Sequence, residues 1–134
     1  MAFDFVKSQI APNAPDMIWK PTTTSETYKV GETLKLSSAG KLTKASGTDV
    51  PEFVSLADYV APASNAKDIP VVEINAGQIY AAPLQASGAS LKAGDKVTIH
   101  TDGLQITATT TSGVAEIVKL NGTSVGDKAW VHLA

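Results

Sequence analysis

The sequence predicts an all-β fold, either a small β-barrel or a sandwich of two related β-halves, preceded by an extended N-terminal arm. The first observation is a repeat. A small residue, a glycine and an acidic residue lead into alternating apolar and polar residues at 30–36, 93–99 and 125–131. The second observation is that turn signals recur every eight to twelve residues along most of the chain. Alternation places every second side chain on one face of a strand, and closely spaced turns are typical of short antiparallel strands.

Nine or ten short strands account for the pattern between residues 26 and 133. Pro70 stands near the start of its strand, where the missing N–H interrupts no central ladder. Asn121-Gly122 is the strongest turn signal, because this pair favours the tight turns of hairpins. The expected strands are 26–30, 33–37, 41–45, 52–59, 69–74, 78–82, 96–101, 104–109, 114–120 and 128–133.

These strands are expected to form one β domain over residues 27–134, with an internal repeat around 30–59 and 93–122. Beyond the repeated turn, 53–56 lies over 117–120 when one gap is allowed. The repeat predicts two β-halves that pack on a shared core. Closure into a barrel would remove exposed sheet edges, and the residues leave barrel and sandwich both open.

Residues 1–26 form the expected arm, because prolines and polar residues interrupt regular structure there. The segment 10–16 holds two prolines, each of which removes a backbone donor and restricts the residue before it. The segment 20–25 is also loop-like. The arm nevertheless carries several large apolar side chains, which would be unusual in a free tail. We therefore expect it either to wrap its own domain or to dock onto a neighbour, with simple disorder as a third alternative.

The composition excludes several classes of function. Only 18% of the residues are charged, the net charge is −2, and all 11 basic residues are lysine. Without arginine forks or a basic stripe, nucleic-acid binding is not expected. The absence of cysteine excludes disulfides, thiolate zinc sites and cysteine nucleophiles. No apolar run approaches the roughly 20 residues of a membrane span. The first residues also lack a basic-then-apolar export signal, so we expect no membrane and no Sec export.

The groups that could carry chemistry are few and scattered. His100 and His132 occupy matching positions in two copies of the repeat and are expected to point outward. A metal site needs three or four ligands, and neither histidine has an acidic neighbour on its strand face. Glu32, Asp95 and Asp127 follow the repeated glycines and are expected to accept hydrogen bonds from turn amides. We therefore expect no catalytic residue and no metal.

Five segments, 31–45, 52–59, 69–74, 91–107 and 113–118, follow one another in an order that resembles the small head-decoration, or capsid cement, proteins of tailed bacteriophages. The resemblance covers most of residues 28–134 and rests on strand order and turn motifs. It implies a non-enzymatic virion structural protein without a cofactor, which binds the outside of an assembled shell of major capsid protein. It also implies a homotrimer at three-fold or quasi-three-fold positions that stabilises the head. Its place would be the capsid exterior, after synthesis in the host cytoplasm.

The side chains expected to contact the capsid or a sister subunit are the large apolar groups of the arm and two outward groups of the last strand: Phe3, Phe5, Ile18, Trp19, Trp130 and His132. An alternative is a non-catalytic carbohydrate-binding β module on a virion or cell surface, with Trp130 and Tyr80 as the sugar platform. A weaker alternative is an accessory domain of a β-barrel hydrolase, which needs paired carboxylates in a deep pocket.

Overall fold

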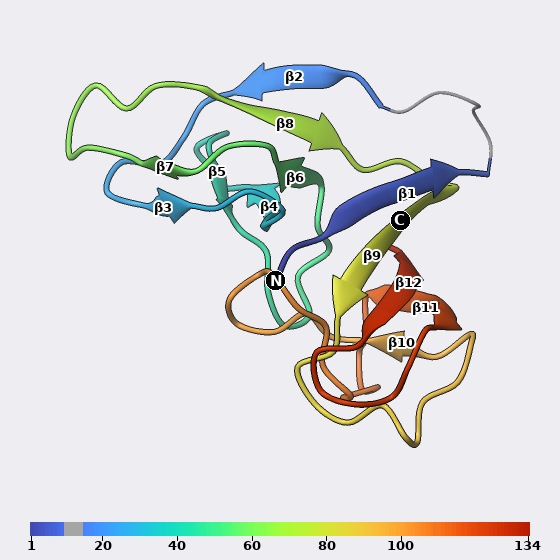
Figure 1. The fold of residues 1–134 in the computed structure, drawn as a ribbon. Helices are drawn as coiled ribbons and strands as arrows, with labels where there is room; N and C mark the ends of the chain where they lie inside the picture. The colour runs from blue at the N-terminus through green and yellow to red at the C-terminus, as the bar shows by residue number, and fades with distance from the viewer. Residues whose placement is uncertain (10–14) are drawn as a thin grey trace.

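In the computed structural model the chain forms two five-stranded antiparallel sheets and one two-stranded sheet (Figure 1), which confirms the predicted all-β class. The structure describes residues 1–9 and 15–134, and that part of the chain contains no helix. The strands are β1 (Asp4–Ser8), β2 (Met17–Lys20), β3 (Thr27–Tyr28), β4 (Thr33–Leu36), β5 (Leu42–Lys44), β6 (Phe53–Ser55), β7 (Tyr59–Val60), β8 (Ile69–Glu73), β9 (Gln78–Pro83), β10 (Lys96–Val97), β11 (Ala115–Leu120) and β12 (Lys128–His132).

The two large sheets divide the sequence almost in two. Sheet A has the order β1-β9-β12-β11-β10 and comes mainly from the second half of the chain. Sheet B has the order β2-β8-β6-β4-β5 and comes from the first half, while β3 and β7 pair separately. Figure 1 shows β2 and β8 at one end of the molecule and β10 to β12 at the other. Sheet B also curls, because the Leu42 N–H donates to the Pro21 carbonyl at 2.8 Å and so brings the end of β2 to β5.

The predicted arm, residues 1–26, supplies one edge strand to each large sheet. β1 pairs with β9, with Asp4 opposite Ala81, and β2 pairs with β8. The arm therefore packs against its own domain, as one of the expected alternatives has it. Residues 10–14, which belong to the segment expected to be irregular, lie outside the described residues.

Two clusters of buried apolar side chains hold the fold together. The larger cluster lies between the two large sheets and takes Tyr80 and Val131 from sheet A and Val72 from sheet B. The smaller cluster lies inside the curl of sheet B and includes Leu34 and Val71. Each fully buried side chain of this size contributes about 1.5–3 kcal/mol relative to an exposed one. Both cores therefore depend on strands from distant parts of the sequence.

The three glycines of the repeat adopt the same backbone conformation. Their φ angles are 82° at Gly31, 95° at Gly94 and 90° at Gly126. In each copy the N–H of the following acidic residue donates to the carbonyl three residues earlier, at 3.0–3.1 Å. This is the geometry of a type II turn, in which the third residue needs a positive φ and is usually glycine. The repeated motif is thus a repeated turn.

Each of these turns also forms the same two hydrogen bonds with a neighbouring segment. The glycine N–H donates to Ser55, Ile117 or Leu84, and that residue donates back to the carbonyl of the acidic residue. Ser55 is therefore the structural equivalent of Ile117. The sequence alignment of 53–56 with 117–120 is wrong by two residues. It relied on strand alternation, and alternation looks the same after a shift of two.

Four expected strands differ clearly in the structure. Those expected at 26–30 and 96–101 are shortened to β3 and β10. The strand expected at 52–59 is divided into β6 and β7, because the Ser55 hydroxyl donates to the Ala57 carbonyl at 2.9 Å and accepts the Ala57 N–H at 3.2 Å. Such local side-chain bonds give the backbone an alternative to the sheet ladder. The strand expected at 104–109 is not formed, and Ile106 makes only isolated bridges to Leu84 and Ile99.

Candidate interaction surface

Exposed apolar side chains lie next to one another on one face of sheet B. Trp19 on β2 is opposite Pro70 on β8, and the Leu56 N–H donates to the Pro70 carbonyl at 3.0 Å. Leu56, Pro70 and Trp19 therefore form one cross-strand row, and Met17 lies two residues from Trp19 on the same face. Trp19 is 59% exposed, Met17 53% and Leu56 41%. We call Met17, Trp19, Leu56 and Pro70 the sheet B apolar surface.

This surface is exposed because sheet A covers only part of the same face. The neighbouring cross-strand row contains Val54 and Val72, which are buried in the larger core. The row with Pro70 lies beyond that cover. Trp19 is thus held on β2 and Leu56 directly follows β6, so the core fixes the backbone near both while their side chains meet solvent.

The other arm residues that were expected to contact a partner are less accessible. Phe3 is only 2% exposed and belongs to the larger core. Phe5 is half-buried and meets Tyr80 edge to face, with ring centroids 5.7 Å apart. Ile18 is half-buried against the smaller core. Of the four expected arm residues, Trp19 is the one that presents most of its side chain to solvent.

Trp130 and His132 lie on the outer face of sheet A, as the alternation along β12 predicts. The ammonium groups of Lys7 and Lys119 lie 5.5 Å and 5.4 Å from the centroid of the Trp130 ring. The His132 Nδ1 is 3.1 Å from the Gln78 carbonyl, to which it donates when it carries the proton. Both side chains are half-buried. This face is therefore cationic and aromatic, and it is separate from the sheet B apolar surface.

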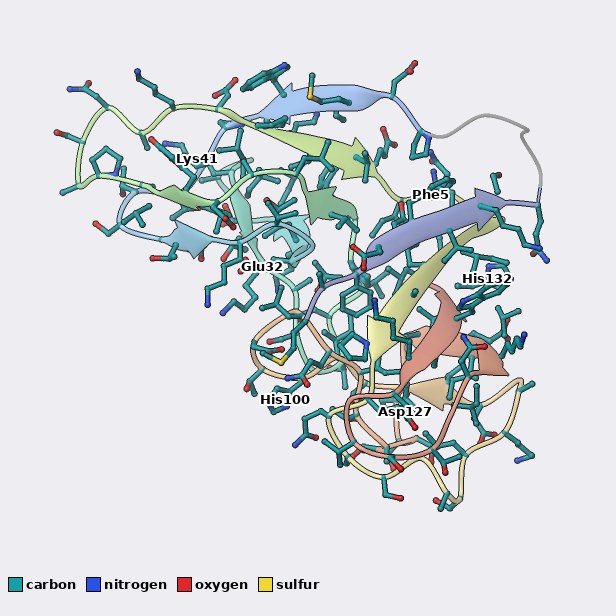
Figure 2. All side chains as sticks on the ribbon, in the orientation of Figure 1. Phe5, Glu32, Lys41, His100, Asp127 and His132 are labelled. Atoms are coloured by element: carbon teal, nitrogen blue, oxygen red, sulfur yellow. The ribbon has the colours of Figure 1, made fainter. Side chains whose placement is uncertain are left out.

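The two histidines are not brought together. Figure 2 shows His100 in the loop beyond β10 and His132 on β12, well apart. In residues 1–9 and 15–134, no three acidic, histidine or cysteine side chains are grouped so that they could hold a metal ion. The same ranges contain no helix of the length and apolar character needed to cross a membrane.

The acidic residues of the repeated turns divide into two kinds. Asp95 accepts the Lys92 N–H and Asp127 accepts the Ser124 N–H, each at 3.0 Å, which confirms the expected role of these carboxylates. Glu32 is different, because it is only 2% exposed. Its Oε2 atom is buried and has no hydrogen-bond partner among the described residues.

Glu32 lies against the loop around Gly103, which belongs to the second half of the repeat. A Cβ atom placed on Gly103 would be 3.0 Å from the Glu32 Cγ and 3.2 Å from the Lys44 Cγ. Burial raises the pKa of Glu32 to about 7; Lys44 and Lys29 lower this pKa, and Glu26 raises it. Sequence reasoning missed this buried carboxyl, since the turn position alone does not show which copy of the repeat is covered.

A shallow groove of about 350 Å³ runs along the two-stranded sheet. It is lined by Thr27, Tyr28, Lys29, Asp58, Tyr59 and Val60. Its one carboxylate, Asp58, accepts the Val30 N–H at 2.9 Å. The hydrolase alternative needs two carboxylates across a pocket, and this groove does not supply them.

The sugar platform expected from Trp130 and Tyr80 is not formed. Tyr80 is fully buried, its hydroxyl donates to the Gln78 Oε1 at 2.8 Å, and burial raises its pKa to about 12. Trp130 meets lysine ammonium groups instead. The residue pair that motivated the carbohydrate-binding alternative therefore does not share a surface.

Sequence reasoning identified Trp19 but missed Met17, Leu56 and Pro70. The alternation of Met17 and Trp19 was a signal for one exposed strand face. No local sequence pattern predicts the strand pairing that places Leu56 and Pro70 beside Trp19. No protein-family model matches the chain, and no curated protein sequence matches it.

Proposed function

We propose that this protein is a virion structural protein that binds the outer surface of an assembled bacteriophage capsid and reinforces contacts between major capsid protein subunits. The observation that carries the proposal is the sheet B apolar surface. Large apolar side chains that adjoin one another in solvent mark an interaction site more often than single exposed ones. The resemblance of residues 28–134 to head-decoration proteins suggests the capsid as the partner.

The support beneath this surface suits a contact that must resist force. β8 lies between β2 and β6, and its Val71 side chain is fully buried. Trp19 and Pro70 are thus presented on a fixed sheet rather than on a loop. A preorganised surface loses little conformational entropy on binding, so more of the contact energy appears as affinity.

A surface of four residues binds weakly as a single contact, since stable interfaces usually involve about 20–30 residues on each side. We infer that the protein acts as a homotrimer, in which three such surfaces engage the shell together. Joining the sites raises the effective concentration of the second and third contacts, and overall binding then exceeds that of one site by about 10²–10⁴.

The first test replaces Trp19 or Leu56 by serine. Each substitution removes an exposed apolar side chain without emptying the core, so thermal melting of the free protein should change little. Binding should weaken at least about tenfold, because loss of a buried anchor side chain at an interface costs more than about 1 kcal/mol. The measurement is co-sedimentation with shells assembled from the major capsid protein of the same phage.

Val50→Ser is the matched control, because Val50 is 65% exposed and lies outside the apolar surface. It should bind shells like the unmodified protein. Unchanged shell binding by both Trp19→Ser and Leu56→Ser would contradict the proposal. A specific hit for the unmodified protein on a glycan array would favour the carbohydrate-binding alternative.

A further inference from the structure

β2 is an edge strand of sheet B, and along Met17–Lys20 it pairs with β8 alone. Just beyond it the Pro21 carbonyl accepts the Leu42 N–H of β5, so the free part of this edge ends at Lys20. The pairing shows which of its backbone groups bond to β8. The Pro70 carbonyl accepts the Leu56 N–H of the β6 side, so the backbone groups of the next residue, Val71, turn toward β2. Ile18 is opposite Val71 and therefore uses its N–H and C=O groups on β8.

Met17 and Trp19 flank Ile18, so their N–H and C=O groups point to the free edge. In the described chain, neither Met17 nor Trp19 makes a backbone hydrogen bond to any element on this free side. Edge strands usually carry charges or bulges that prevent further pairing. This edge carries Asp16 and Lys20 at its ends, but Met17 and Trp19 between them are exposed and apolar, so the centre of the edge is open to one more strand.

The sequence of this edge complements itself. From Pro15 to Pro21 it reads Pro-Asp-Met-Ile-Trp-Lys-Pro, with Ile18 at the centre. When two copies run antiparallel about Ile18, Met17 of one lies opposite Trp19 of the other. Each of these outward-facing pairs exchanges two backbone hydrogen bonds, so the two pairs form about four. A shift of the register by two residues would bring a proline into the ladder and lose donors.

The charges at the ends of the strand support the same register. Met17 is opposite Val72, so Asp16 lies beside Glu73, and these exposed carboxylates form no ion pair in the described chain. The Lys20 ammonium lies 5.6 Å from the Phe53 ring centroid and also has no carboxylate partner there. In the antiparallel pair, Lys20 of each copy stands opposite Asp16 of the other. Opposite charges directly across two strands are stabilising, whereas like charges are destabilising.

We propose that β2 pairs with β2 of a second copy of this chain about a two-fold axis, with Ile18 opposite Ile18. The pairing joins two copies of sheet B into one continuous sheet. It places the Met17 and Trp19 side chains of both copies side by side on one face. Leu56 and Pro70 stay outside the joint, whereas Met17 and Trp19 belong both to it and to the sheet B apolar surface. The two-fold contact is argued from the strand edge alone, and it is distinct from the three-fold contact of the proposed homotrimer.

The first experiment traps the pair covalently. The chain has no cysteine, so Ile18→Cys introduces a single thiol. Directly opposed residues of this kind have Cα atoms about 4.5 Å apart, within the range that a disulfide spans. Under mild oxidation the full-length Ile18→Cys chain should form a covalent dimer. Val125→Cys, at a 66% exposed turn position of the other half of the molecule, should stay largely monomeric. Equal or slower crosslinking of Ile18→Cys overturns the proposal.

The second experiment exchanges the charges at the ends of the joint. Because Lys20 is half-buried and lies over the Phe53 ring, thermal melting of each variant checks that it is folded. Lys20→Glu puts two carboxylates opposite each other at both ends of the joint. It should weaken dimerisation in sedimentation equilibrium about tenfold, from two charge pairs of up to about 1 kcal/mol each. The double variant Asp16→Lys with Lys20→Glu restores opposite charges and should recover the affinity to within about twofold.

A role of Lys20 in the fold alone would not be rescued by the exchange, so failure of the double variant to recover also overturns the proposal. The same holds for an unmodified chain that stays monomeric at every concentration. Shell binding by the Lys20→Glu chain separates this inference from the proposed function. If the Lys20→Glu chain still binds shells but no longer dimerises, the β2–β2 pairing is supported. If it loses shell binding but still dimerises, Lys20 is not part of the β2–β2 pairing.

Discussion

Glu32 shows how the fold changes the chemistry of one residue within a repeated motif. Asp95 and Asp127 occupy the same turn position, but their carboxylates bond to a turn amide near the surface. Glu32 also has a backbone hydrogen bond with Lys29 of its turn, but it lies beneath Gly103, where its Oε2 atom finds no hydrogen-bond partner in the described chain. Burial of a carboxyl without full hydrogen bonding disfavours the charged form. The consequence is a pH-dependent contribution to stability.

We expect Glu32 to reduce the stability of the protein as pH rises. The folded-state pKa is about 7 and the ordinary value is 4.5. Below pH 4.5 the group is protonated in both states, so there is no penalty. Between these values the unfolded chain releases the proton first, so the free energy of unfolding falls as pH increases, and above about pH 7 the loss is complete. A shift of this size corresponds to about 1–3 kcal/mol.

Glu32→Gln keeps the shape and removes the titration, so this variant should unfold at a higher temperature than the unmodified protein at pH 8. The two should differ little at pH 4. Glu73→Gln is the control, since Glu73 is exposed, and it should leave the pH profile of the melting temperature unchanged. A Glu32→Gln profile that parallels the unmodified profile over this range would refute the role of Glu32.

At the scale of elements, the strands are short because neighbouring segments approach closely and side chains compete for the backbone. β6 ends where the Ser55 hydroxyl bonds to Ala57. β10 has only two residues, and the chain that leads into β11 passes directly over it. At Gly113, the space that a Cβ atom would take is already occupied by the carbonyl group of Lys96. The absence of a side chain at Gly113 is therefore a condition for the β10–β11 pairing.

We expect Gly113→Ala to destabilise the protein by about 2–4 kcal/mol, because backbone cannot move aside as a side chain can. The added Cβ would lie 2.1 Å from the Lys96 carbonyl oxygen. The comparison is Gly40→Ala, where φ is 74° but no atom lies within 4 Å, so only the conformational cost of about 1 kcal/mol applies. Urea denaturation measures both. Equal losses for the two variants would be inconsistent with this close approach.

At the scale of the whole molecule, the N-terminal segment connects the two halves of the repeat. It forms the edge of sheet A with β1 and the edge of sheet B with β2. Phe3 is buried in the core between the sheets, and its N–H donates to the Gly31 carbonyl at 2.9 Å. The two sheets therefore share both a core and a strand connection. Proteins joined in this way unfold as one cooperative unit.

We expect Phe3→Ala to lower the free energy of unfolding by about 3–5 kcal/mol, the usual loss for removal of a buried phenylalanine. Phe5→Ala should cost less, because Phe5 is only half-buried. Circular dichroism and tryptophan fluorescence should report a single coincident transition for the unmodified protein. Two separate transitions, or a larger loss for Phe5→Ala, would show that the arm does not couple the sheets.

The features that could be predicted from the sequence are those set by nearby residues. The alternation and the closely spaced turns led to the all-β class, which the structure confirms. The repeated Gly31, Gly94 and Gly126 turns were also readable, because a type II turn needs only four consecutive residues. Asp95 and Asp127 bond within the same turns, so their role followed from the motif.

The sequence by itself therefore determined the class of the fold, its turns and the absence of thiol chemistry, since each depends on residue types or on neighbours along the chain. Only the tertiary structure decided that the arm forms two edge strands and that Glu32 is buried. It also decided that Trp19 stands beside Leu56 and Pro70. The physical reason is that strand pairing and burial depend on residues far apart in sequence. The two-residue period of a strand shows which side chains share a face, but it does not show which strand pairs with it.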